Sequence, residues 1–358
     1  MLLSVLFIAA LLFAVQWYSL NRSLRYFSYR SEPDRGLAEC GEVFSIKTVL
    51  RNTGWFPLLF LHLKEYVPRE TVFEEDSTVG NRTAGQQRAD TVIDEILYVL
   101  SHQEVIRTLR MSLSKRGRYL FGSARVTAGD FFGIDSRTQR YDTPHEVVVY
   151  PKKADIEEWM PEIDDYLGDI SVQRFILPDP IETIGFREYT GREPMKEISW
   201  PKTLSSGQLT VRQFDHFSDL KACILVNIEA ALPQEIEYVY SAARTVAEDL
   251  EKRHIPFSFH TNALIASSAV VSSHVMSGSG RVHLQKVLEL LGRSTYEKTA
   301  GLDRLIVQAA GSRDVQKAYL LISAASVRPD VLKHYEQRYG IRILDLKRKE
   351  THEDTRSD

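Results

Sequence analysis

The sequence predicts a multidomain protein with an N-terminal transmembrane helix, an immunoglobulin-like β-sandwich and then an α/β domain with a mainly parallel sheet. Three observations predict this class. An almost wholly apolar stretch opens the chain, short alternating segments separated by turns follow it, and continuous apolar runs then alternate with amphipathic helices. The 358 residues are 43% apolar and 26% charged, which is enough for two ordinary globular domains.

Residues 1–20 are predicted to form a membrane anchor. The stretch 2–15 is almost entirely apolar, and Trp17 and Tyr18 form an aromatic pair at its end. No Lys or Arg precedes the stretch, whereas three arginines follow it: Arg22, Arg25 and Arg30. The positive-inside rule therefore predicts a single-pass protein of the cell membrane whose folded body faces the cytoplasm. A cleaved signal peptide is the alternative, but it needs a basic stretch before the apolar run and a small-residue cleavage site after it.

Residues 31–151 are predicted to form the β-sandwich. Phe44, Ile46 and Leu50 alternate with polar residues, which is the pattern of a half-buried strand, and Asn52-Thr53-Gly54 then supplies a turn. Further strands are expected over residues 58–67, 93–100, 105–113, 119–126 and 147–150. Short strands at this spacing, separated by Gly, Asp and Pro, are typical of a sandwich of immunoglobulin-like size.

The second half of the chain is predicted to be a connector, residues 152–215, and an α/β domain, residues 216–347. The connector begins with an acidic stretch, 152–180, that shows no clear period. Residues 222–228 then form a continuous apolar run, which predicts a strand buried on both faces, and Pro233 opens an amphipathic helix. This alternation of strand and helix continues to residue 346 and indicates a sheet covered on both faces. The charged tail, residues 348–358, is expected to fray.

Two passages carry motifs of a known family. The first comprises residues 115–119, 130–134 and 148–151, and the second comprises Gly185-Phe186-Arg187-Glu188-Tyr189-Thr190-Gly191-Arg192, Lys196-Glu197-Ile198-Ser199-Trp200-Pro201-Lys202 and residues 209–211. Together they resemble the domain of unknown function 58 family. The resemblance implies a bacterial, membrane-tethered protein that ends in a von Willebrand factor A-like domain. It also implies a partner, because such proteins are often encoded beside a MoxR-type AAA+ ATPase and are thought to act with it.

The sequence departs from the family pattern at the positions that would bind metal. A metal-binding von Willebrand factor A domain has Asp-x-Ser-x-Ser after its first strand, because a hard divalent cation needs converging oxygen ligands. Here Asn227, Glu229 and Ala231 stand at those three positions. We therefore expect a degenerate site without a bound metal, and we interpret Glu229 as a solvated loop carboxylate. Arg192 likewise replaces the Asp that the family usually has after its glycine.

The signature passage holds the densest group of candidate functional residues, namely Arg187, Glu188, Tyr189, Gly191, Trp200 and Lys202. One interpretation is structural, with Trp200 buried as an anchor that packs the connector against the α/β domain. The other is a surface that binds a partner or an anion, since Arg presents a rigid donor fork and Trp a large contact face. We expect Trp200 to be buried, and Arg187 and Lys202 to be more exposed and to contact a partner.

The remaining sequence features favour an interaction protein over an enzyme. The net charge of −3 argues against nucleic-acid binding, and two cysteines are too few for a disulfide framework. The sequence contains no Walker A loop, no His-Glu-x-x-His and no dinucleotide fingerprint, so no cofactor is expected, and His260 and His274 are interpreted as surface or loop residues. The prediction is a non-enzymatic adaptor that works with a MoxR-type ATPase in complex or envelope assembly. The alternatives are a hydrolase or transferase with a noncanonical site on the connector, and an extracytoplasmic adhesion module.

Overall fold

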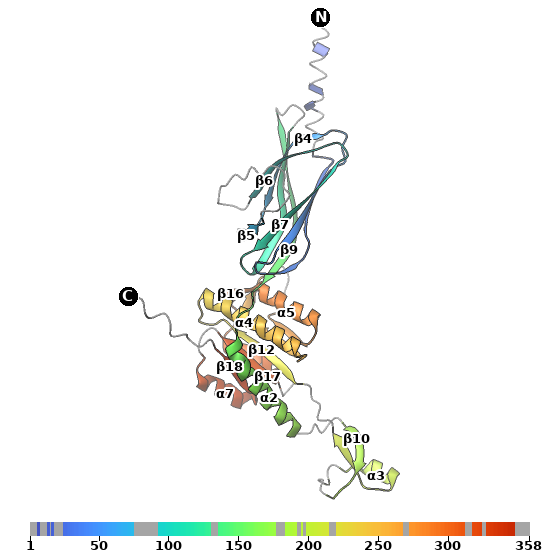
Figure 1. Ribbon diagram of the computed structural model, residues 1–358, viewed down its shortest axis with the longest axis vertical. Coiled ribbons are helices and arrows are strands. Elements are labelled where there is room, and N and C mark those ends of the chain that lie inside the picture. Colours follow the sequence, from blue (N-terminus) through green and yellow to red (C-terminus); the bar gives the residue numbers. More distant parts are fainter. Residues whose placement is uncertain are drawn as a thin grey trace, which may run out of the picture. The chain divides into compact units, whose positions relative to one another are not determined.

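A computed structural model describes most of the chain (Figure 1). The described residues are 6–7, 13–14, 16–17, 24–74, 92–129, 135–176, 183–191, 195, 198–214, 220–267, 272–311, 317–323 and 327–347. They form two compact units. Unit 1 comprises Met1–Lys152 with Ile265–Val270 and Leu288–Thr295, and unit 2 comprises the rest of the chain.

Unit 1 is built from two sheets. The first has the order β1 (Phe27–Pro33), β3 (Phe44–Asn52), β7 (Glu104–Leu113) and β5 (Thr71–Phe73), and its neighbouring strands are antiparallel. The second has the order β2 (Leu37–Glu39), β9 (Ser136–Tyr150), β8 (Gly117–Gly129), β4 (Leu58–Tyr66) and β6 (Val92–Val99). In β3 every second side chain is buried, because one face of the strand contacts the core and the other contacts solvent. The predicted long hairpin loop after residue 74 lies outside the described residues.

Charged side chains lie inside the sandwich, between one cluster of buried apolar residues that includes Leu50 and another that includes Ile46. Arg107 of β7 forms ion pairs with Glu65 of β4 at 3.2 Å and with Glu95 of β6 at 2.7 Å, and all three residues are buried. Tyr29 and Thr48 donate hydrogen bonds to Oε1 of Glu65 at 2.8 and 2.9 Å. Burial, and next the nearby Glu65 carboxylate, raises the pKa of Tyr29 well above its usual range. The phenol therefore keeps its proton and acts as a donor. We call these five residues the buried charge cluster.

Unit 2 is organised around a five-stranded sheet with the order β15 (His274–Gly278), β13 (Phe257–Thr261), β12 (Lys221–Asn227), β17 (Lys317–Ser323) and β18 (Ile343–Leu346). The pairs β12/β13, β12/β17 and β17/β18 are parallel, whereas β15 runs antiparallel to β13 at one edge. Residues 222–227 of β12 and every residue of β17 are buried, as expected for strands with packed layers on both faces.

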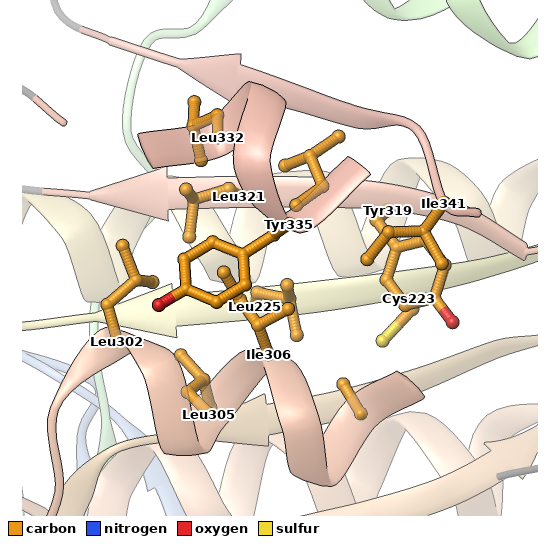
Figure 2. Close-up of a cluster of buried hydrophobic side chains, with 12 residues drawn as sticks. Cys223, Leu225, Leu302, Leu305, Ile306, Tyr319, Leu321, Leu332, Tyr335 and Ile341 are labelled. Atoms are coloured by element: carbon orange, nitrogen blue, oxygen red, sulfur yellow. The ribbon is translucent and has the colours of Figure 1, made fainter. Parts of the chain in front are cut away.

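Helices cover both faces of this sheet. They are α4 (Pro233–Lys252), α5 (Arg281–Arg293), α6 (Leu302–Ala310) and α7 (Pro329–Tyr339). Figure 2 shows Leu305 and Ile306 of α6, and Tyr335 of α7, pointing toward Leu225 of β12, and all four belong to one apolar cluster. Burying such side chains contributes about 1.5–3 kcal/mol each, so this cluster holds α6 and α7 against the sheet. The strands β14 (Ala263–Ile265) and β16 (Ser294–Lys298) form a further two-stranded sheet.

The stretch 152–180 contains an ordered helix, which corrects its prediction as an aperiodic connector. After the short 3-10 helix η1 (Glu157–Trp159), α2 runs over Met160–Ile176. Trp159, Ile163 and Leu167 are buried at a spacing of four residues, and Nε1 of Trp159 donates to the carbonyl of Lys347 at 2.8 Å. The helical spacing of these residues was obscured by the acidic residues between them, which form the solvent-facing side.

The predicted fold class was wrong. Among the described residues no helix combines the length and the apolar character needed to cross a membrane, so the transmembrane helix expected over residues 1–20 is not found. Most of those 20 positions, like the tail 348–358, lie outside the described residues. Strands predominate over helices, and the C-terminal sheet is mixed because β15 is antiparallel. The von Willebrand factor A-like assignment is therefore not retained.

Candidate functional site

The signature passage folds as a small hairpin with one short helix, which we call the lobe (residues 183–214; Figure 1). Strand β10 (Thr183–Glu188) pairs antiparallel with β11 (Thr210–Phe214), and α3 (Trp200–Ser206) precedes β11. Ile198 and Val211 pair in an isolated bridge and are both buried, so they supply the interior of the lobe. Helix α3 ends at Gly207, whose φ of 73° is the left-handed conformation that glycine adopts most readily at a helix end.

Large apolar side chains are exposed on the lobe. The exposed fractions are 48% for Phe186, 55% for Trp200, 84% for Leu204 and 45% for Leu209, and we call these four residues the lobe surface. Trp200 and Leu204 are four residues apart on α3 and therefore share one face of the helix. Nζ of Lys202 lies 6.0 Å from the centre of the Phe186 ring, which places a cation beside that ring.

The structure places all six signature candidates on the lobe. Arg187, Glu188, Gly191 and Lys202 are exposed, and Tyr189 is half-buried, with its N–H donating to the carbonyl of Leu209 at 2.8 Å. Gly191 has a φ of 87°, which explains a glycine there. The prediction that Trp200 is a buried anchor was wrong, because helix α3 attaches through its N-terminal end to the backbone of Thr210, and the indole remains outside. Arg192 lies outside the described residues.

A second polar group lies at the carboxyl end of β12, where the degenerate metal positions were expected. Asn227 is buried, its Nδ2 donates to Oγ of Ser323 at 3.1 Å, and its Oδ1 accepts from Nδ2 of Asn262 at 2.7 Å. Oδ1 of Asn262 accepts the N–H of Ile228 at 3.0 Å. Side-chain amides thus join the ends of β12, β13 and β17. Asn262 was not among the predicted site residues; it directly follows β13, whereas Asn227 is the last residue of β12.

Glu229 is paired with a cation, which corrects its interpretation as a solvated carboxylate. Its Oε1 lies 2.7 Å from Nζ of Lys298, and its Oε2 accepts the N–H of Leu302, at the start of α6, at 3.2 Å. The Lys298 hydrogen bond, followed by the Leu302 N–H, lowers the pKa of Glu229 below its usual range. Ala231 is half-buried and contributes only a methyl group. That this site holds no divalent cation stays a prediction.

A pair of histidines lies on the neighbouring strands β13 and β15. The rings of His260 and His274 are stacked with their centres 5.4 Å apart, and His260 is buried, so its interpretation as a surface residue was wrong. Burial, followed by electrostatic repulsion from His274 and Lys317, lowers the pKa of His260 to about 4. His260 is therefore neutral at pH 7, and protonation of this ring opposes folding.

The stability of the protein is expected to fall as the pH is lowered from about 6.5 toward about 4, because unfolded His260 takes up a proton and the folded ring does not. The full effect is on the order of 3 kcal/mol. His260→Gln should flatten this part of the pH profile, whereas His334→Gln, at an exposed position on α7, should not. Chemical denaturation at a series of pH values measures both variants, and equal slopes for wild type and His260→Gln would contradict the assignment.

Comparisons with known proteins do not show a family for this chain. No family model matches it, and no curated protein matches it. Similar solved structures include a type II cohesin domain from the cellulosome of Acetivibrio cellulolyticus, with 12% identity, 34% of this chain and 94% of that chain covered, and a TM-score of 0.25. The CARDB domain of the PF1109 protein from Pyrococcus furiosus has 9% identity, 34% and 86% coverage and a TM-score of 0.22. A PapD-like domain of human CEP192 has 12% identity, 36% and 87% coverage and a TM-score of 0.21. At these scores the likenesses carry no argument about this chain.

Proposed function

We propose that this chain is a non-enzymatic interaction protein that binds a protein partner through the lobe surface. The observation that carries the proposal is the exposure of Phe186, Trp200 and Leu204 on one small lobe. Exposed apolar side chains of this size, when they gather, mark interaction sites more often than scattered surface residues do. Tryptophan and arginine are also the residues that most often dominate binding energy at protein interfaces.

The charges beside the lobe surface indicate the chemistry of the partner. Arg187 and Lys202 are both exposed, and so is the acidic residue Glu188 next to Arg187. A partner with an apolar side chain flanked by carboxylates would complement this surface. The resemblance to the domain of unknown function 58 family supplies a candidate partner, a MoxR-type AAA+ ATPase, and both that family and that partner stay proposals. The cytoplasmic placement of the protein also stays a prediction.

The alternative prediction, a hydrolase or transferase with its site on the connector, requires Arg187, Glu188 and Lys202 to converge in a pocket that excludes water. These three side chains are exposed instead. In water of high dielectric constant the interactions between their charges are screened. Exposure favours binding over chemistry at this position.

Photo-crosslinking tests the docking role directly. A photoreactive phenylalanine analogue at Leu204 of the intact chain, co-expressed with the MoxR-type ATPase, is expected to crosslink to the ATPase. The matched control is the same analogue at Trp55, which is 85% exposed but belongs to unit 1. Absence of a protein crosslink from position 204, or equal crosslinking from position 55, would show that the lobe is not the docking surface. A crosslink from 204 to another protein would keep the docking role and replace the partner.

A further inference from the structure

A small polar cavity lies beside the side-chain amides that join the ends of β12, β13 and β17 in unit 2. It shares no residue with the lobe surface. Its volume is about 220 Å³, and it is lined by Thr261, Asn262, Ser273, Thr299, Arg304 and Gln308. Pockets for drug-sized ligands are usually about 300–1,000 Å³, so this cavity suits a small molecule or a single side chain. It lies at the carboxyl end of β13, and the crevice at the carboxyl ends of strands is where open α/β sheets bind ligands.

Hydrogen bonds fix one wall of the cavity. Nδ2 of Asn262 donates to Asn227 at 2.7 Å and to the carbonyl of Ala300 at 3.2 Å, so both of its N–H groups are used. Thr299 donates from its hydroxyl to the carbonyl of Asn262 at 3.1 Å. Thr261 accepts the N–H of Ala263 at 3.2 Å. These hydrogen bonds hold Asn262, Thr299 and Thr261 in place. The N–H and O–H groups that could donate to a ligand belong to other residues that line the cavity.

The charge of the cavity is positive. Arg304 is the charged residue among those that line it, and it forms no ion pair with the described part of the chain. The nearby carboxylates are occupied elsewhere, because Asp303 accepts a hydrogen bond from the hydroxyl of Tyr335 and Glu229 is paired with Lys298. No carboxylate lines the cavity to neutralise the guanidinium. An arginine in this setting favours a planar or tetrahedral oxyanion, since its donor fork matches two oxygens at once.

Two neutral groups complement the guanidinium. Ser273 lines the cavity with a hydroxyl that can donate to an oxygen. Gln308, one helical turn after Arg304 on α6, is held by a 3.3 Å contact between its Nε2 and Nδ1 of His274. This contact orients the amide among the residues that line the cavity. Together with Arg304, these residues provide donors from α6 and from the segment that precedes β15.

We infer that this cavity binds a small oxyanion, a carboxylate or a phosphate, with Arg304 as its principal ligand. The anion comes either from a free small molecule or from an acidic side chain of a polypeptide. This inference does not depend on the lobe surface, because the two sites share no residue. Binding is expected to weaken as salt concentration rises, since the interaction is between charges and the arginine is partly open to solvent.

Calorimetric titration of the intact chain with inorganic phosphate, succinate and an acetylated aspartate peptide tests the inference. At least one probe is expected to saturate, and the preferred probe distinguishes a free anion from a side-chain carboxylate. Arg304→Gln should lower the affinity at least about tenfold, and Arg304→Lys should lower it less, because lysine keeps the charge but not the fork. Arg281→Gln, at an exposed position on α5, is the matched control and should bind as the wild type does.

Two results would overturn the inference. One is the absence of saturable binding by all three probes at millimolar concentration. The other is equal affinity of wild type and Arg304→Gln. Because Arg304 is exposed, its replacement is expected to leave folding intact, and circular dichroism of each variant checks this. If no anion binds but position 204 still crosslinks, the anion site is refuted and the docking function is not. If an anion binds but position 204 gives no crosslink, the docking function is refuted and the anion site is not.

Discussion

Replacing Arg107 with methionine is expected to cost about 3–5 kcal/mol of the stability of the sandwich, because it leaves two buried carboxylates without their cation. Glu65 and Glu95 lie on the opposite sheet from Arg107, and both are buried. Glu65 would keep its hydrogen bonds from Tyr29 and Thr48, but these donors are neutral. Methionine fills much of the space of arginine, so the loss is electrostatic more than steric.

Hydrogen exchange of peptides from β3 and β7 in the intact chain gives the free energy of local opening for both proteins. Arg110→Met is the matched control, since it makes the same substitution on the same strand at an exposed ion pair with Glu74. Exposed pairs contribute about 0–1 kcal/mol, so this variant should differ little from wild type. Equal protection of β7 in the two variants would refute the role of the buried charge cluster.

Local patterns in the sequence located many individual elements. The strand expected over 58–67 is β4, the apolar run 222–228 corresponds to β12, and the helix that Pro233 opens is α4. Each is encoded by neighbouring residues, so periodicity is sufficient to find it. Helix α2 was missed because acidic residues interrupt the row formed by Trp159, Ile163 and Leu167. The buried charge cluster could not be predicted, since Arg107 gives no local sign that two glutamates from another sheet will meet it.

The candidate site was predicted in composition but not in geometry. The passage around Arg187 was selected for its residue types, and its function stays a prediction. The burial of Trp200 was predicted from the usual behaviour of tryptophan and was wrong. Exposure depends on what packs against a residue, and no local pattern reports that. Lys298 illustrates the same limit, because it meets Glu229 from a strand 69 positions away in the sequence. Hydrophobic periodicity reports only residues close together in the sequence, so it cannot predict a contact of this kind.

Trp200→Ala is expected to leave the melting temperature close to that of the wild type and to weaken partner binding by at least about 2 kcal/mol, roughly 30-fold. The indole is 55% exposed, and surface substitutions of this kind usually change stability by about 0.5 kcal/mol or less. The affinity falls because a partner that covers the lobe surface would bury the indole completely. Leu204→Ser should act in the same direction, since Leu204 shares the helix face.

Partner binding through the lobe surface is tested most directly by titrating the purified MoxR-type ATPase, or the partner identified by crosslinking, onto wild type, Trp200→Ala and Trp55→Ala. Trp55 provides the matched control because it is an exposed tryptophan on unit 1, where no docking is proposed. The expected result is that Trp55→Ala binds as the wild type does and Trp200→Ala binds about 30-fold more weakly while remaining folded. Wild-type affinity for a folded Trp200→Ala would contradict the lobe surface as the site of partner binding.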